Sequence, residues 1–203
     1  MTDTTTDTTT GTTGLTVVTD PTGAVPMTPV AADPMALRTT SALFPSGVAA
    51  LSAVVEGEDG PEPVVLVASS FQVGISLDPP LVLFAVQHTS TSWPKLRAAV
   101  QAGGKLGVSV LGEAHDVAAR TLASRALRAA ERFDGLDTTT LPSGAHFVHG
   151  APVWLECSIH SEVPAGDHDV VLLEVHSLGG VPETEPLVWH SSGFRTLTPK
   201  ADA

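Results

Sequence analysis

The sequence predicts a mainly β fold with a few flanking helices, in which the strands form a closed or split barrel. Valine-rich apolar runs bounded by glycine, proline or aspartate recur along residues 47–197, and their length and composition are typical of β-strands. Most of these runs are apolar on both faces, which indicates burial on both sides. They amount to about seven or eight strands without an internal repeat. A barrel leaves such strands few open edges.

Length and composition favour one folded domain preceded by a tail. A chain of 203 residues with 42% hydrophobic residues is long and apolar enough to bury one sizeable core. Residues 1–34 are rich first in threonine and aspartate and then in proline and glycine, a composition that predicts a flexible tail. We therefore expect the folded domain to span residues 35–199.

The first elements after the tail are a short helix and four strands. The helix is expected at residues 35–44, and the strands follow at residues 47–57, 63–71, 80–87 and 105–112. Between the second and third strands, the segment "SLDPP" ends in two prolines that return the chain rigidly to the barrel. We interpret that segment as a scaffold loop.

Two longer helices interrupt the strands. Residues 91–104 open with hydroxyl residues that can cap a helix, carry Pro94 in the first turn and end at two glycines. The second helix is expected over residues 113–135. Its apolar side chains recur at helical spacing, at Val117, Ala118, Leu122, Ala126 and Ala129.

The C-terminal third returns to β-structure. Strands are expected at residues 151–163 and 169–178, joined by the turn "PAGDH" at residues 164–168. The last run, residues 186–197, has Ser-Ser-Gly at its centre, which predicts a hairpin turn.

Charge and hydropathy exclude several classes of partner. With a formal net charge of −12 and only 10 Lys and Arg residues, the chain is not expected to bind nucleic acid or an anionic membrane surface. No apolar run approaches the roughly 18 residues that span a bilayer. The first 37 residues contain no Lys or Arg and no continuous apolar stretch, so we expect no secretory signal and a cytoplasmic location.

The familiar catalytic and metal-binding motifs are not found. Cys157 lies in the apolar run "VWLECSI", which indicates a small buried residue and not a reactive thiol. The eight histidines form no metal-binding motif, so no metal site is predicted. "AGGKLG" follows a helix and precedes a strand, the reverse of a phosphate-binding glycine loop, and no G-x-S-x-G motif occurs.

Three loops remain as candidates for a site, each where a strand is expected to end. They are Ala68–Phe71, Thr89–Ser92 and Gly166–His168. The second loop carries four successive hydroxyl residues before a helix N-terminus, where free N–H groups and the helix dipole favour an anion. Ordinary helix capping needs only one of those hydroxyls. Both interpretations stay open on the residues alone.

Seven segments together resemble the flavin reductase family. They are "FPSGVAALSAV", "ASSFQVGISLDPPLVLFAV", "TSTSWPKLR", "LGVSVL", "RFDG", "VPAGDHDVVLLEVHSL" and "PLVWHSSGFRTL", and they cover roughly residues 36–198. The resemblance implies the FMN-binding split β-barrel. It also implies an NAD(P)H-dependent flavin reductase that uses FMN or FAD with NADH or NADPH and supplies reduced flavin to a partner monooxygenase. The family's homodimer is implied as well.

The resemblance also assigns roles to residues. It implies flavin-ring contacts at the end of the second strand, phosphate contacts in the hydroxyl loop, and nicotinamide contacts at the "AGDH" turn, where His168 is the candidate catalytic residue. The implied flavin-binding residues are Val67, Ala68, Ser69, Ser70, Phe71, Thr89, Ser90, Thr91, Ser92, Trp93, Lys95 and Ser109, and the implied nicotinamide-binding residues are Gly166, Asp167 and His168.

Departures from the family pattern keep other functions open. Val65, Leu66 and Val67 stand where the family often has Gly-Met-Thr, and Ser109 replaces a frequent asparagine. These changes are compatible with a flavin-binding split-barrel protein without turnover that acts as an accessory or binding module. A split-barrel oxidase with its own small substrate is a third possibility, although no charge cluster suited to such a substrate is visible.

Overall fold

The computed structural model describes residues 8–10, 16–18, 27, 29, 30, 33–57 and 60–197. The chain divides into two units, Met1–Pro45 with His190–Ser192, and Ser46–Trp189 with Gly193–Ala203. In the first unit, helix α1 (Pro34–Ser41) begins where the Asp33 carboxylate accepts the N–H groups of Met35 and Ala36. Strands β1 (Thr8–Thr10) and β2 (Thr16–Val18) pair antiparallel. Most of the predicted tail lies outside the described residues.

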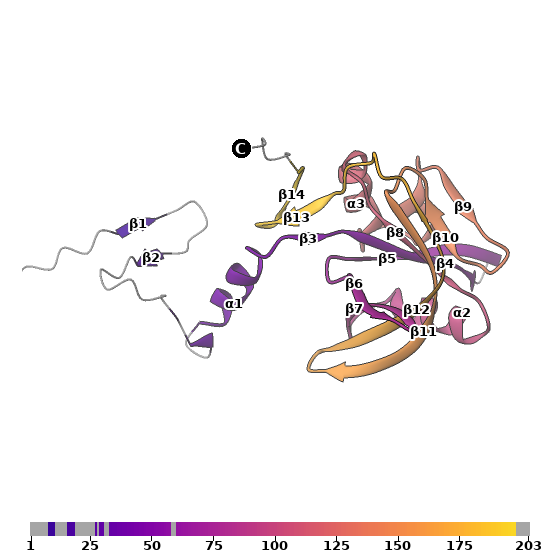
Figure 1. Ribbon diagram of the computed structural model, residues 1–203, viewed down its shortest axis with the longest axis horizontal. Coiled ribbons are helices and arrows are strands. Elements are labelled where there is room, and N and C mark those ends of the chain that lie inside the picture. Colours follow the sequence, from indigo (N-terminus) through magenta and orange to yellow (C-terminus); the bar gives the residue numbers. More distant parts are fainter. Residues whose placement is uncertain are drawn as a thin grey trace, which may run out of the picture. The chain divides into compact units, whose positions relative to one another are not determined.

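The second unit is built on an antiparallel sheet of seven strands (Figure 1), in the order β5-β4-β8-β11-β12-β7-β6. This sheet confirms the predicted mainly β fold. The strands are β4 (Ala49–Gly57), β5 (Gly60–Ala68), β6 (Gln72–Leu77), β7 (Pro80–Gln87), β8 (Leu106–Val110), β11 (Val153–Ala165) and β12 (His168–Gly180).

The smaller elements flank this sheet. They are the short strands β3 (Ser46–Gly47), β9 (Thr138–Thr140), β10 (His146–Val148), β13 (Val188–His190) and β14 (Gly193–Arg195), the helices α2 (Trp93–Gln101) and α3 (Asp116–Leu122), and the 3-10 turns Glu113–His115 and Ala130–Phe133. The predicted C-terminal hairpin is confirmed, because Ser191 and Ser192 adopt the positive φ angles that its tight turn requires. Among the described residues, no helix is long and apolar enough to cross a bilayer.

The two edges of the sheet approach each other at one hydroxyl group. Strand β5 forms one edge, and β7 lies beside the other edge strand, β6. Ser70, which follows β5, accepts a hydrogen bond from the Ala85 N–H of β7 and donates one to the Ala85 C=O, both at 3.0 Å. This contact, called here the β5–β7 junction, holds the ends of two strands that are far apart in the sheet order.

Strand β6 differs from the expected scaffold loop. Residues 72–77 pair antiparallel with β7, so "SLDPP" is the end of an edge strand and its turn. Its apolar side chains Val73, Ile75 and Leu77 are 56%, 38% and 92% exposed. The second unit therefore carries an apolar edge strand.

The helix predicted over residues 113–135 is wrong in its length. Helix α3 ends at Leu122, and the chain continues as a loop before the turn Ala130–Phe133. The Ser124 hydroxyl accepts the N–H of Ala126, a local bond that competes with helical hydrogen bonding. The predicted apolar face also fails at Val117, which is 71% exposed.

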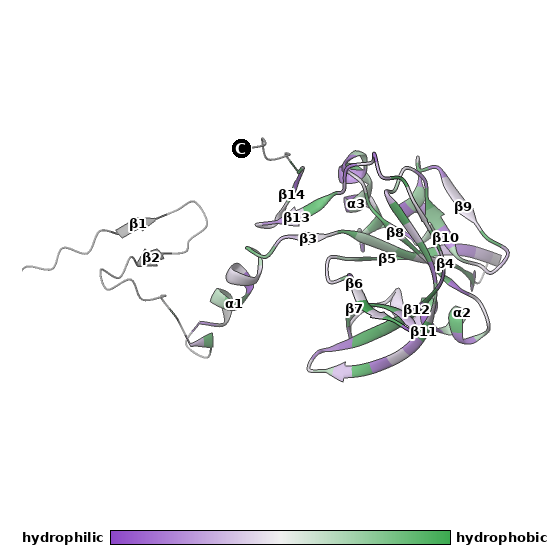
Figure 2. Cartoon of the chain, in the orientation of Figure 1, coloured by the Kyte–Doolittle hydropathy of each residue, from purple (hydrophilic) through white to green (hydrophobic). Residues whose placement is uncertain are grey.

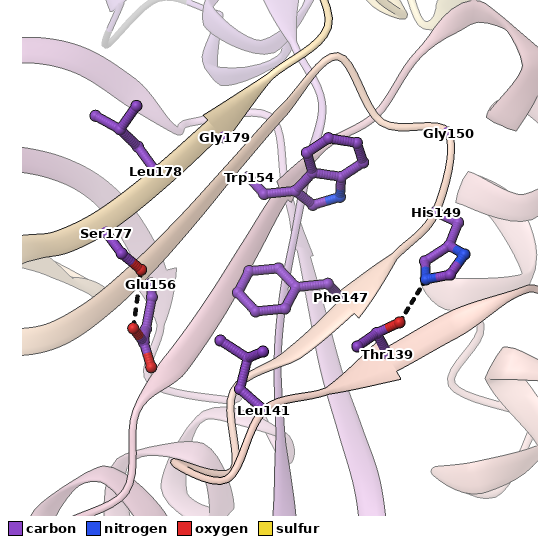
Figure 3. Close-up of a pocket in the computed structure, with 10 residues that line it drawn as sticks. All are labelled: Thr139, Leu141, Phe147, His149, Gly150, Trp154, Glu156, Ser177, Leu178 and Gly179. Atoms are coloured by element: carbon purple, nitrogen blue, oxygen red, sulfur yellow. Dashed lines mark hydrogen bonds between the residues drawn. The ribbon is translucent and has the colours of Figure 1, made fainter.

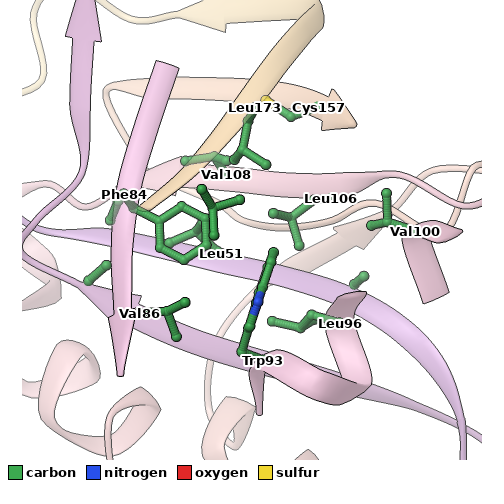
Figure 4. Packing of buried hydrophobic residues seen from close by; sticks show 14 of the residues in the cluster. Leu51, Phe84, Val86, Trp93, Leu96, Val100, Leu106, Val108, Cys157 and Leu173 are labelled. Carbon is green, nitrogen blue, oxygen red and sulfur yellow. The ribbon is translucent and has the colours of Figure 1, made fainter. Parts of the chain in front are cut away.

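The main core lies on one face of the sheet and includes Leu51, Phe84, Trp93 and Leu106 (Figure 4). Figure 2 shows hydrophobic and hydrophilic residues alternating along β11, whereas β12 carries a continuous apolar run at residues 170–173. Cys157 is fully buried in this core, and burial raises the pKa of its thiol to about 12. The prediction that Cys157 is buried is confirmed.

On the opposite face, strand β10 lies directly against β8 and β4. A Cβ added at Gly107 would stand 2.3 Å from the His146 carbonyl oxygen, so only glycine permits this approach. The Ser52 hydroxyl donates to the same carbonyl at 2.7 Å, and the Ser109 hydroxyl accepts the Val148 N–H at 3.0 Å. Small and hydroxyl side chains thus attach β10 to the sheet.

Candidate functional site

Two adjoining cavities lie beside the β5–β7 junction. The loop cavity, of about 130 Å³, is lined by the hydroxyl loop and by the segment after α3. The strand cavity, of about 310 Å³, is lined by the ends of β5 and β7. Leu66, Val67, Ser90 and Arg125 line both. Eight predicted site residues are brought together in this pair of cavities, namely Val67, Ala68, Ser69, Ser70, Ser90, Thr91, Ser92 and His168.

The hydroxyl loop, residues Thr89–Ser92, accepts hydrogen bonds from helix α2 and from Arg132. The Ser90 hydroxyl accepts the Trp93 N–H at 3.1 Å, which caps helix α2. The Ser92 hydroxyl accepts a hydrogen bond from Arg132 Nη1 at 3.3 Å, and only 9% of the Ser92 residue is exposed. Since an N–H group occupies an acceptor position on each oxygen, both O–H groups are left to donate to a ligand. Helix capping and anion binding are therefore compatible in this loop.

Two arginines that the sequence interpretation missed complete the loop cavity. Arg132 also donates to the main-chain carbonyls of Val65 and Leu127, at 3.5 and 3.3 Å, so its guanidinium is held in the wall. Arg125 lines both cavities. Within the part of the chain that the structure describes, Arg125 forms no ion pair, whereas its neighbour Arg128 pairs with Glu131 at 2.6 Å. An unpaired guanidinium beside two donor hydroxyls favours an anion.

Of the two serine hydroxyls expected at the end of β5, one is free in the structure. Ser69 is exposed at its rim, but the Ser70 hydroxyl is occupied by Ala85 at the β5–β7 junction. Leu66, Val67 and Ala68 form the apolar part of the wall. We therefore assign Ser70 a structural hydrogen bond and leave Ser69 as the hydroxyl available to a ligand.

His168 lies on the same cavity from the β12 side. It begins β12, pairs in register with Gln87, and follows the turn in which Gly166 has φ +68°. Its Nδ1 lies 2.7 Å from the Asp167 carboxylate, and the hydrogen bond between them lowers the pKa of Asp167. This contact orients the imidazole at the cavity edge.

The remaining predicted residues lie away from the two cavities. Trp93 is buried in the core, Lys95 pairs with Glu62 at 3.5 Å, and Ser109 supports β10. Phe71 packs on the core, and Thr89 lies 3.4 Å from the Gln87 side chain. Gly166 and Asp167 shape the turn and do not line the cavity.

A larger apolar cavity of about 530 Å³ shares no lining residue with this site (Figure 3). Its polar groups bond to one another. The Glu156 carboxylate accepts from Ser143 and Ser177, which lowers its pKa, and His149 bonds Thr139. We place the candidate site at the loop and strand cavities, because donor hydroxyls and Arg125 line them together with most of the predicted site residues.

The two cavities differ in the chemistry of their lining residues. Donor hydroxyls and Arg125 suit an anion in the loop cavity. The strand cavity offers apolar side chains and the polar ends of strands, an arrangement typical of cofactor sites.

Comparison with known proteins identifies the family to which this chain belongs. Residues 41–198 match the flavin reductase like domain. A flavin reductase of Pseudomonas putida is 33% identical over 164 residues, which are 81% of this chain and 90% of that protein. The reductase subunit HsaB of a flavin-dependent monooxygenase from Rhodococcus jostii is 33% identical, with 83% of this chain and 80% of that protein covered.

A solved structure is similar over nearly the same range. The NADH:FAD oxidoreductase SgcE6 of Streptomyces globisporus, in complex with NAD and FAD fragments, has a TM-score of 0.72 and 32% identity over 88% of this chain and all of that chain. The chain belongs to the flavin reductase family and has its split β-barrel fold, as its motifs predicted.

The two adjacent serines are expected to respond differently to replacement. Ser70→Ala leaves the Ala85 N–H without its partner and should lower the free energy of unfolding by about 0.5–1.5 kcal/mol. Ser69→Ala removes an exposed hydroxyl and should change it by less than about 0.5 kcal/mol. Urea denaturation measures both, and equal losses would contradict the structural assignment of Ser70.

Proposed function

We propose that this protein is an NAD(P)H:flavin oxidoreductase that binds FMN or FAD in the loop and strand cavities and supplies reduced flavin to a partner monooxygenase. The observation that carries the proposal is that donor hydroxyls line one cavity together with Arg125, which forms no ion pair among the described residues. This local set of donors occurs in a chain of net charge −12. When bound, the nicotinamide and the flavin supply the hydride transfer themselves. The protein has to bind both molecules and align them.

The loop cavity is the proposed phosphate site. Ser90 and Ser92 donate O–H groups that are oriented by Trp93 and Arg132, and Arg125 supplies the positive charge. Charge-assisted hydrogen bonds of this kind are about twice as strong as neutral ones. A phosphate is thus bound locally although the whole chain is acidic.

The strand cavity is the proposed site for the flavin ring. Leu66 and Val67 offer apolar contacts, and the exposed hydroxyl of Ser69 offers a donor to a polar ring edge. The departures from the family pattern at Leu66 and Val67 do not remove these contacts, since both side chains line the cavity.

His168 is proposed to position the nicotinamide. It lines the strand cavity, and its contact with Asp167 holds the imidazole. Hydride transfer requires two rings stacked about 3–3.5 Å apart and needs no general base. A residue at the cavity edge therefore acts by alignment.

A homodimer is part of the proposal, as is the cytoplasmic location, where dissolved NADH is available. Among the described residues, β6 is an edge strand of the sheet, and it exposes Val73, Ile75 and Leu77. Exposed apolar edge strands are ready to pair with another chain. The proposed monooxygenase partner is supported by relatives such as the reductase subunit HsaB of a flavin-dependent monooxygenase from Rhodococcus jostii.

Replacing Arg125 tests the proposed phosphate site. Arg125→Ala should weaken FMN binding by about tenfold or more, because it removes a charge-assisted hydrogen bond, and should leave riboflavin binding unchanged. Flavin fluorescence titration gives both dissociation constants. Arg128→Ala is the matched control, since that neighbouring arginine pairs with Glu131. Equal weakening of FMN and riboflavin would contradict the phosphate assignment.

Turnover is tested with NADH or NADPH and either flavin, followed as loss of nicotinamide absorbance. We expect flavin-dependent oxidation. In His168→Ala the KM for the nicotinamide should rise about three- to tenfold, by loss of one positioning contact, with flavin affinity unchanged. Tight flavin binding without oxidation in the wild-type protein would instead support the binding-module alternative.

The oligomeric state is tested by analytical ultracentrifugation. The wild-type protein should sediment as a dimer, and Val73→Lys combined with Leu77→Lys should sediment as a monomer, because these like charges repel one another and cannot be buried unpaired. Leu178→Asp is the control, since Leu178 is 79% exposed at the separate apolar cavity. A monomeric wild-type protein would contradict the dimer.

A further inference from the structure

Trp93 links the hydroxyl loop to the core. Its indole packs beside Phe84 and Leu96 (Figure 4), with the Phe84 ring edge-on at a centroid distance of 5.1 Å, and only 4% of the residue is exposed. Its main-chain N–H donates to the Ser90 hydroxyl at 3.1 Å. The position of this tryptophan therefore fixes the direction of the Ser90 O–H group.

The indole N–H finds its partner on a distant strand. Trp93 Nε1 donates to Glu162 Oε2 at 3.3 Å, across 69 positions of sequence. Glu162 lies on β11, which ends at Ala165, just before the turn that leads to His168. One carboxylate thus connects the loop that lines the flavin site with the strand that carries the nicotinamide turn.

We propose that Glu162 is a positioning residue that holds the hydroxyl loop, through Trp93, in its ligand-binding geometry. This inference rests on the proposed function, because the phosphate of FMN is the ligand by which it is measured. A buried indole N–H requires an acceptor. Without Glu162, the buried indole loses that acceptor, and a shift of Trp93 toward another acceptor would displace the main-chain N–H that the Ser90 hydroxyl accepts.

The ion pair of Glu162 with Arg97 does not account for this role. Arg97 Nη1 lies 3.4 Å from the same carboxylate oxygen, but the Arg97 side chain is 42% exposed. Exposed ion pairs contribute little to stability, since water and salt screen them. The bond to the buried indole is the contact that fixes the loop.

Four variants separate these contacts. Glu162→Ala removes both bonds, Trp93→Phe removes only the indole N–H and keeps a ring beside Phe84, and Arg97→Ala removes only the ion pair. Glu162→Gln keeps an acceptor oxygen for the indole. Dissociation constants for FMN and riboflavin are measured on each full-length variant, and thermal unfolding is recorded beside them.

The expected result is a selective loss of phosphate recognition. Glu162→Ala and Trp93→Phe should weaken FMN binding about three- to tenfold and leave riboflavin binding within about twofold, because one hydrogen bond orients the phosphate donor and not the ring site. Glu162→Gln and Arg97→Ala should bind FMN within about twofold of wild type. A residue that merely stabilised the fold would weaken both flavins together.

Two results would overturn the inference in distinguishable ways. If the wild-type protein prefers FMN to riboflavin and both Glu162→Ala and Trp93→Phe keep that preference, the positioning role is wrong and the phosphate site stands. If the wild-type protein binds FMN and riboflavin equally, the phosphate site itself is wrong and the positioning role falls with it. Should Glu162→Ala fail to fold, Trp93→Phe decides between these results.

Discussion

The functional site depends on the contact by which the Ser70 hydroxyl joins β5 to β7. These strands stand near opposite edges of the seven-stranded sheet, and the pair of 3.0 Å bonds to Ala85 brings their ends together. The strand cavity is lined from both sides of this junction, by Ser69 from one chain segment and Gln87 from the other. The site exists because the sheet curls far enough for its edges to meet without pairing along their length.

An acidic chain can bind an anion when the local donors are arranged in advance. Ser90 and Ser92 accept bonds from Trp93 and Arg132, so their O–H groups are directed before a ligand arrives. The cost of ordering those side chains is then met during folding and not during binding. Net charge, from which no nucleic-acid partner is expected, therefore says little about whether such a loop can bind a single phosphate.

The sequence allowed the strands and the "AGDH" turn to be predicted, because apolar runs and turn residues are local signals, and the family resemblance added eight of the residues that line the two cavities. Arg125 escaped prediction because residues 113–135 have helical periodicity, and the competing bond of Ser124 is visible only in the structure. Ser109 was placed at the flavin by resemblance, but it faces β10, since strand alternation and the glycine at 107 commit that face to packing. The hydrogen bond of Ser70 was equally hidden, because its partner Ala85 has no distinctive side chain.

Hydroxyl groups at the site divide into those that complete the fold and those that remain for the ligand. The Ser70 hydroxyl both donates a hydrogen bond to Ala85 and accepts one from it. The Ser90 and Ser92 hydroxyls accept hydrogen bonds from the protein, and their O–H groups remain available to donate. Replacing Ser90 would thus remove a ligand contact and uncap helix α2 at once. Replacing Arg125 changes the charge at the proposed phosphate site, and replacing Glu162 changes the position of the hydroxyl loop. These variants can therefore separate effects on ligand binding from effects on folding, which replacement of the serines would combine.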